Sequence, residues 1–175
     1  IAARFSRVGP MAIIDLDAAL SRGENSALIG ELCAQYACRV GGGIRDLDTA
    51  RQWLDAGAEK IIIGTAARPD FLKQIPKERL IVALDARDGK VEVKGWTEGT
   101  GQSVLSQMEA LRDYVSGFLV TFIECEGRMG GTRIDLVADM VDVAGDARVT
   151  IAGGVATAQE VAELDRLGAD AQVGM

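Results

Sequence analysis

The sequence predicts an α/β fold, a (β/α)8 barrel from which one strand is missing. Three observations support this prediction. Short apolar runs alternate with amphipathic stretches along the chain, a glycine-rich motif occurs twice, and the length of 175 residues is short of a complete barrel, which needs about 250. Alternating strands and helices of this kind force parallel pairing with right-handed crossovers.

The first half of the chain opens on the end of a helix over residues 1–9, which Gly9-Pro10 closes. The apolar run 11–16 predicts a strand buried on both faces, with carboxylates at its tip. Asn25 and Ser26 then cap a helix with an apolar stripe, formed by Leu28, Ile29, Leu32 and Tyr36.

The next elements follow the glycine turn at 41–43, which a strand near residue 38 precedes. A helix over residues 47–56 ends at Gly57, where a left-handed residue is expected. Residues 61–65 form a strand, residues 66–74 allow only a brief helix, and the apolar strand 80–84 delivers Asp85.

The second half interrupts this rhythm between Asp85 and Gln102, which is long for a strand-to-helix connection. Residues 90–94 alternate after Asp88-Gly89 and predict an excursion of extended chain and turn. The remaining elements are the helix 103–114, the strand 118–123, the helix 134–143, the strand 149–152, the helix 157–167 with Thr157 as its cap, and the strand 171–174.

The glycine turn is the part of the sequence that repeats. Gly41-Gly42-Gly43 returns as Ala152-Gly153-Gly154, with 111 residues from Gly43 to Gly154. In each copy a further glycine stands 14 residues later, at Gly57 and Gly168, and a strand then ends in Gly64 or Gly174. Tight strand-to-helix geometry explains one such turn as well as phosphate binding does. Two copies at kept spacing favour two phosphates.

The repeat also predicts what lies outside the chain. The counterpart of Asp85 in the first half falls 26 residues before Ile1. We therefore expect residues 1–175 to be a single partial barrel domain of two half-barrel repeats, without its first strand and its last helix.

Composition excludes several classes of function. The net charge of −7 is not gathered in a tail, which disfavours nucleic acid and anionic membranes as partners. No run is long enough to span a membrane and no signal peptide is present, so a cytoplasmic location is expected. Three cysteines without metal-like spacing, Cys33, Cys38 and Cys125, are expected to be free thiols. Without histidine, acid–base chemistry falls to carboxylates.

In a barrel of this type, the carboxyl ends of all strands open on one mouth, where catalytic groups gather. The candidate residues at these ends are Asp15, Gly42, Gly43, Arg45, Gly64, Thr65, Asp85, Thr121, Glu126, Gly153, Gly154 and Gly174.

Five motifs together resemble the HisA family, the ProFAR isomerases of histidine biosynthesis, over nearly the whole chain. They are Asp15-Leu16-Asp17, Gly41-Gly42-Gly43-Ile44-Arg45, Ile63-Gly64-Thr65, the segment from Leu84 to Trp96, and Ala152-Gly153-Gly154-Val155. The resemblance implies an Amadori rearrangement of an aminoaldose to an aminoketose, on a small substrate with a phosphate at each end. It implies no cofactor, no metal and a monomeric complete protein.

The resemblance also implies roles for single residues. Asp85 matches the catalytic aspartate of the fifth barrel strand, whereas the aspartate of the first strand has no counterpart, so the chain by itself is expected to be inactive. Gly42, Gly43 and Thr65 would hold one phosphate, and Gly153, Gly154 and Gly174 the other. Arg45 would clamp the substrate and Trp96 would stack on its imidazole. Asp15, Thr121 and Glu126 are expected as further substrate contacts, although Glu126 stands where most relatives have aspartate.

Structural alternatives remain for several of these residues. Asp85 could cap a helix or form an ion pair, Asp15 could be structural, and Trp96 could cover the rim of the barrel. Arg45 could pair with Asp46 or Asp48.

Two functional alternatives remain as well. The protein could be a dual-substrate isomerase that also acts on phosphoribosylanthranilate. The chain could also be a non-catalytic fragment that still binds phosphate or associates through its open sheet edge.

Overall fold

The computed structural model describes residues 1–93, 98–128 and 130–174. The chain divides into two compact units, Ile1–Ile81 and Val82–Met175.

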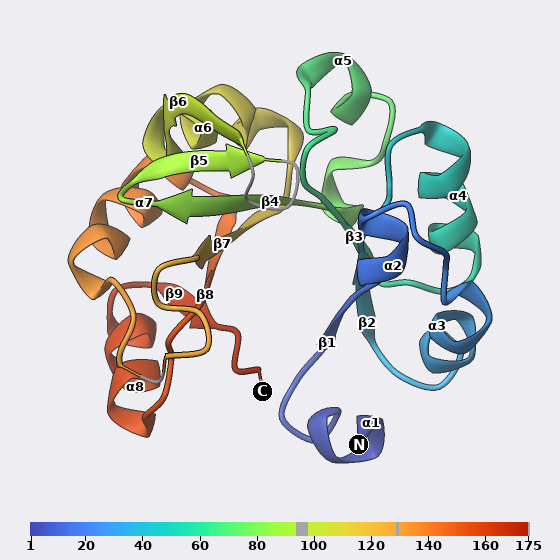
Figure 1. The fold of residues 1–175 in the computed structure, drawn as a ribbon, viewed down its shortest axis with the longest axis horizontal. Coiled ribbons are helices and arrows are strands. Elements are labelled where there is room, and N and C mark those ends of the chain that lie inside the picture. Colours follow the sequence, from blue (N-terminus) through green and yellow to red (C-terminus); the bar gives the residue numbers. More distant parts are fainter. Residues whose placement is uncertain (94–97, 129, 175) are drawn as a thin grey trace. The chain divides into compact units, whose positions relative to one another are not determined.

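The first unit is built on three parallel strands that pair in chain order: β1 (Met11–Ile14), β2 (Cys38–Gly41) and β3 (Lys60–Ile63). Helices α3 and α4 lie along one face of these strands (Figure 1). The helices are α1 (Ala2–Phe5), α2 (Leu16–Ala19), α3 (Ser26–Cys33), α4 (Leu47–Asp55), α5 (Pro69–Leu72) and the 3-10 turn η1 (Lys77–Arg79).

The second unit carries the remaining strands, β4 (Leu80–Arg87), β5 (Lys90–Val93), β6 (Glu98–Ser103), β7 (Gly117–Phe122), β8 (Arg148–Ala152) and β9 (Ala169–Ala171). The sheet order is β4-β7-β8-β9, with β5 and β6 added on the side of β4. The helical elements are α6 (Val104–Leu111), η2 (Arg112–Tyr114), η3 (Ile134–Leu136), α7 (Val137–Ala144) and α8 (Ala158–Arg166).

A strand is present near each of the seven predicted positions, but the last one spans Ala169–Ala171 and does not reach Gly174 as predicted. Strands β7, β8 and β9 pair in parallel as β1, β2 and β3 do. Strands that follow one another in chain order with helices between them are the arrangement of a (β/α)8 barrel. The structure thus confirms the predicted fold class, an incomplete barrel of α/β type.

The prediction that strand 11–16 is buried on both faces is wrong. Exposure alternates along β1, and Ile14 is 39% exposed. The reason is positional: in the described part of the chain, β1 is the end strand of the sheet order and pairs with β2 alone. The side chains of β1 therefore have a neighbouring strand on one side only.

Of the two helix caps predicted from the sequence, one is correct and one is wrong. Thr157 caps α8 as predicted and forms a reciprocal capping box with Glu160. Asn25 precedes α3 as predicted but makes no capping bond with its side chain, which donates instead to Asp15 and Asp17. The predicted stripe of α3 is also partly wrong, since Leu28 is 60% exposed and Cys33 is buried in its place.

The excursion predicted after Asp85 is an antiparallel hairpin. Strand β4 continues past Asp85 to Arg87 and pairs with β5. Asp88 and Gly89 form the turn with φ of 49° and 74°. Two consecutive positive φ values match the right-handed twist of a tight hairpin, so this Asp-Gly pair fixes the register that places Asp85 opposite Glu92.

Asp15 organises the loop between β1 and α3. Its carboxylate accepts the N–H of Ala18 at 3.1 Å, the N–H of Asn25 at 2.7 Å and the Asn25 amide at 2.9 Å. Burial of this side chain opposes its charge, but the hydrogen bonds from Asn25 and Ala18 outweigh burial and lower the pKa of Asp15. The sequence-based alternative of a structural role for Asp15 therefore has a clear physical basis.

The two glycine turns have the same backbone conformation. Gly42 and Gly43 have φ of 95° and 71°, and Gly153 and Gly154 have φ of 90° and 79°. A Cβ at Gly42 would lie 2.2 Å from the carbonyl oxygen of Asp15, and one at Gly153 would lie 2.5 Å from that of Phe122. In each turn, the space that a side chain would occupy is thus filled by backbone from the end of the neighbouring strand.

We expect Gly153→Ala to lower the free energy of unfolding by at least about 3 kcal/mol, because it adds backbone strain to a clash with main chain. Gly89→Ala is the matched control, since Gly89 has φ of 74° but nothing within 4 Å of the position that a Cβ would take; we expect a cost of about 1 kcal/mol there. Urea denaturation followed by circular dichroism measures both. Equal costs would show that crowding at Gly153 is unimportant.

We expect Asp15→Asn to destabilise the chain by about 2 kcal/mol at pH 7, because it removes a charged acceptor of three N–H bonds. The folded pKa of Asp15 lies below its unfolded value. Its contribution is therefore present above the unfolded pKa of about 3.9 and is lost as the pH falls through the folded pKa. Denaturation at pH 7 and at pH 3 should show the gap between wild type and variant shrinking in acid. A gap independent of pH would refute this role.

Candidate functional site

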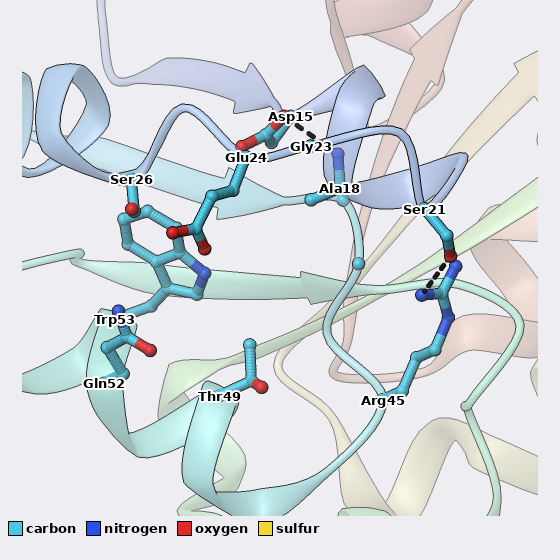
Figure 2. A pocket seen from close by; sticks show the side chains of 12 residues that line it. Asp15, Ala18, Ser21, Gly23, Glu24, Ser26, Arg45, Thr49, Gln52 and Trp53 are labelled. Carbon is cyan, nitrogen blue, oxygen red and sulfur yellow. Dashed lines mark hydrogen bonds between the residues drawn. The ribbon is translucent and has the colours of Figure 1, made fainter.

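In the first unit, the predicted residues gather at the carboxyl ends of β1, β2 and β3. Gly42, Gly43 and Arg45 line a pocket of about 240 Å³ between the loop after β1 and the start of α4. Figure 2 shows its polar wall, to which Asp15, Ser21, Glu24 and Thr49 contribute, with the Trp53 indole at one side. Gly64 and Thr65 follow β3 and are exposed.

Arg45 is engaged with the loop after α2. Its guanidinium donates to the carbonyl oxygen of Ala19 at 2.6 Å and to the hydroxyl of Ser21 at 3.2 Å. Asp46, one of its alternative partners from sequence, instead accepts the N–H of Thr49 at 2.8 Å and caps α4. Arg45 therefore ties the loop that covers the glycine turn, while a guanidinium has further donors for a ligand.

The positive ends of the helices after the two turns are occupied by the protein's own carboxylates. The N–H of Thr49 lowers the pKa of Asp46 at the start of α4. At the start of α8, the N–H groups of Ala156, Thr132 and Thr157 lower the pKa of Glu160 against the effect of burial. An anion bound at either turn would therefore share the start of the following helix with a carboxylate of the protein itself, Asp46 at α4 or Glu160 at α8.

In the second unit, the predicted residues lie at the ends of β7 and β8 and after β9. Thr121 is half-buried opposite Ala152, and Glu126 is exposed in the loop after β7. Gly153 is buried, Gly154 is half-buried, and Gly174 is exposed. The loop after β7 closes over the turn, because a Cβ at Gly154 would lie 2.4 Å from the carbonyl oxygen of Gly131.

Asp85 lies on the polar face of the β4–β5 hairpin. Ala86 and Val91 are buried on the opposite face, whereas Asp85 is half-buried and stands directly across from Glu92. Glu92 is also 4.0 Å from the Arg87 guanidinium. The hairpin therefore presents two carboxylates side by side, of which sequence reasoning identified only Asp85.

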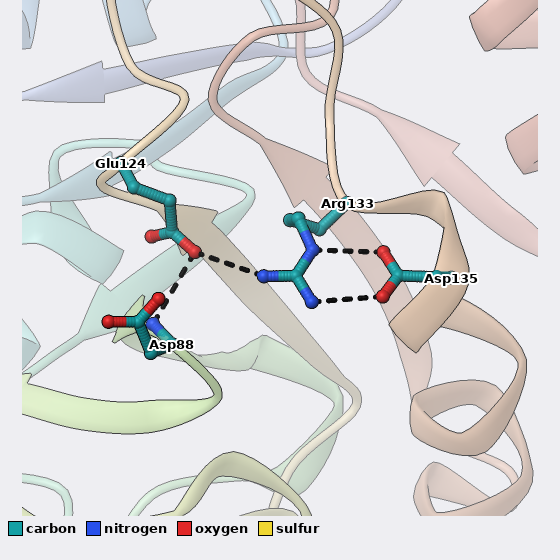
Figure 3. A network of polar contacts seen from close by, with 4 residues as sticks. All are labelled: Asp88, Glu124, Arg133 and Asp135. Carbon is teal, nitrogen blue, oxygen red and sulfur yellow. Dashed lines mark hydrogen bonds and ion pairs between the residues drawn. The ribbon is translucent and has the colours of Figure 1, made fainter.

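A charged network joins this hairpin to the loop after β7 (Figure 3). The N–H of Asp88 donates to Glu124 at 3.4 Å, and Glu124 is 3.6 Å from the Arg133 guanidinium. Arg133 also binds Asp135 through two bonds of 2.9 Å, which raise the pKa of Arg133 and lower that of Asp135. Sequence reasoning missed the network because these loop residues follow no periodic pattern.

The remaining predictions concern Trp96, metals and membranes. Trp96 lies outside the described residues. Among the residues that are described, no group of three His, Cys, Asp or Glu side chains is arranged to hold a metal ion. No helix in that part of the chain has the length and apolarity to cross a membrane.

Comparison with known proteins tests the family resemblance that the sequence motifs indicate. The family model of the histidine biosynthesis proteins matches residues 2–174. A relative from Halobacterium salinarum is 37% identical over 166 residues, which cover 90% of this chain and 68% of the relative. Relatives from Methanocaldococcus jannaschii and Gemmatimonas aurantiaca are 31% and 37% identical, and the chain covers 69% and 78% of them.

All three relatives carry one name, 1-(5-phosphoribosyl)-5-((5-phosphoribosylamino)methylideneamino) imidazole-4-carboxamide isomerase. The family match spans nearly all of the chain, over the same residues that carry the resemblance seen in the sequence. The chain therefore belongs to the histidine biosynthesis protein family and, within it, to the HisA isomerases that its motifs indicate.

Proposed function

We propose that this chain binds the bis-phosphorylated ribosyl aminoimidazole ProFAR and that its residues serve the Amadori rearrangement of that compound. The names of the relatives contain two phosphoribosyl groups, and the chain carries two glycine turns of matching conformation, one in each unit. We assign one phosphate to each turn. Thr65 would contribute a hydroxyl donor in the first unit and Gly174 a backbone approach in the second.

The observation that best supports phosphate binding concerns Gly64 and Gly174. Packing and positive φ explain glycine at the four turn positions. At Gly64 and Gly174, by contrast, nothing lies within 4 Å of the position that a Cβ would take, and the backbone is not in the left-handed region. Close approach of a ligand to bare backbone is a remaining reason for glycine at these two positions, of which Gly64 directly follows β3 and Gly174 lies three residues after β9.

Asp85 is proposed as one of the two proton-transfer groups. The reaction needs an acid that protonates the ring oxygen of the aminoaldose, so that the ring opens to a Schiff base, and a base that removes the proton from carbon two. Histidine is absent from the chain, so carboxylates must do both. The second carboxylate of the family mechanism has no counterpart among these 175 residues, and we infer that the chain by itself binds substrate without turning it over.

Titration of the chain with ProFAR by calorimetry, together with a turnover assay, tests this proposal. Binding without turnover agrees with it and leaves the chain a phosphate-binding fragment of an isomerase. Turnover by the chain would show that a second carboxylate is present, and Glu92 would be the first candidate. Absence of binding at millimolar ProFAR would refute the proposal.

We expect Gly64→Ala and Gly174→Ala each to weaken ProFAR binding at least about tenfold, because the new methyl group occupies the path of a phosphate oxygen. Their free energy of unfolding should change by no more than about 1 kcal/mol, because the positions are open. Gly30→Ala is the matched control, since Gly30 also has nothing within 4 Å but lies on α3. Binding as tight as in this control would contradict the phosphate assignment.

We expect Asp85→Asn to leave the dissociation constant for ProFAR within about threefold of the wild-type value, since proton transfer and binding are separate contributions. In the complete isomerase, the same substitution should lower turnover at least about a hundredfold. Asp139→Asn on the exposed surface of α7 is the control. Turnover retained in Asp85→Asn, or binding lost in that variant alone, would rule out the proposed role.

A further inference from the structure

Two positively charged side chains lie next to each other on the sheet of the first unit. In the parallel register, Ala12 of β1 stands beside Arg39 of β2, and Arg39 stands beside Lys60 of β3. All three residues are at or near the amino ends of their strands. The glycine turn is at the other end of β2, and Gly42 is three residues from Arg39, about 10 Å along an extended chain.

The two cations occupy the face of the sheet opposite α3 and α4, and both are half-buried. Cys38 and Val40, on either side of Arg39, are fully buried, and the thiol of Cys38 hydrogen-bonds that of Cys33 on α3. Side chains alternate between the two faces of a strand, so Arg39 points away from α3 and α4, which lie along the other face (Figure 1). Lys60 shares this face because it pairs with Arg39.

Arg39 has an unmet hydrogen-bond donor there. Its Nε is buried and has no hydrogen-bond partner in the described part of the chain. Another arginine of the same unit shows the usual arrangement: Arg79 donates from Nε to the carbonyl of Glu59 and from a terminal nitrogen to that of Ala58, both at 2.7 Å. A buried donor without an acceptor is costly, so a ligand that supplied an acceptor there would stabilise Arg39.

The surrounding charges favour an acceptor that is negative. Burial lowers the pKa of Lys60, and the charge of Arg39 lowers it further, while Glu59 and Glu78 act in the opposite direction. The two acidic residues support the charge of Lys60, but they leave the Arg39 Nε unpaired. Ala12, which stands beside Arg39, is exposed and has a small side chain.

We propose that Arg39 and Lys60 bind a small oxyanion, such as phosphate, sulfate or a free carboxylate, on the face of the first unit opposite α3 and α4. The guanidinium provides a planar set of donors that matches two oxygens of such an anion, and the ammonium group provides a compact charge. This site is separate from the glycine turns, and it does not depend on the proposed function.

Titration of the complete chain with inorganic phosphate, with chloride added to keep ionic strength constant, tests the proposal. The Nε–H resonance of Arg39 in nitrogen-15 NMR spectra should shift in a saturable way. Lys60→Met should raise the dissociation constant about tenfold, the loss of one charge-assisted contact, and Lys60→Arg should restore binding. Arg51→Met, which removes an exposed cation from α4, should leave the dissociation constant unchanged.

The variant Gly64→Ala separates this site from the glycine turn, because the response of Arg39 should persist when the turn is blocked. A shift that rises linearly with phosphate, or a dissociation constant that is the same in Lys60→Met and Arg51→Met, would overturn the proposal. Loss of the Arg39 response in Gly64→Ala would overturn it too, since the phosphate would then act from the turn.

Discussion

Both units depend on one constraint, the close approach of backbone at the end of one strand to the glycine turn that follows the neighbouring strand. In the first unit the end of β1 approaches the turn after β2, and in the second unit the end of β7 approaches the turn after β8. The carbonyl oxygen of Asp15 occupies the place of a side chain at Gly42, and that of Phe122 does so at Gly153. The loops after β1 and β7 can therefore fold down over the turns. A carboxylate fixes each loop: Asp15 binds Asn25 and Ala18, and Glu160 binds Thr132 and Thr157. The two halves thus reach the same backbone geometry with different side chains.

Because of this packing, the glycines of the turns say less about function than other glycines of the chain do. The paired glycines of the turns suggested phosphate binding because they repeat, yet their conformation and surroundings already require glycine. The helix ends behind them are occupied by Asp46 and Glu160. Positions where the fold tolerates any residue are more informative, and Gly64 and Gly174 are such positions. The proposal of phosphate binding therefore rests more on Gly64 and Gly174, which follow β3 and β9, than on the turns.

Sequence patterns predicted the features that depend on neighbours along the chain. The seven strands follow from apolar runs, the cap at Thr157 from its position before an apolar helix, and the hairpin turn from Asp88-Gly89. Features that depend on distant contacts were not predictable. The side chain of Asn25 prefers a carboxylate ten residues earlier to its own helix, and Arg133 reaches Glu124 through a loop without periodicity. Trp53 is buried on α4 because that helix packs on β3, a contact that no local pattern indicates.

The carboxylates of this histidine-free chain differ in how they are held in place. Some accept hydrogen bonds from backbone N–H groups, whereas Asp85 is positioned through the backbone of its strand. Asp15, Asp46 and Glu160 accept backbone N–H bonds that lower their pKa values, so they stay ionised near neutral pH and cannot serve as proton donors. Their role is to shape the loops around the candidate site. Asp85 is held in another way: its strand is fixed by the register with β5 and by the bond from the Ile123 N–H to the Ala86 carbonyl at 2.9 Å. A group positioned through its backbone does not need its side-chain contacts to hold it in place, so those contacts can change during a reaction. For this reason we propose the hairpin that carries Asp85 as the place of proton transfer.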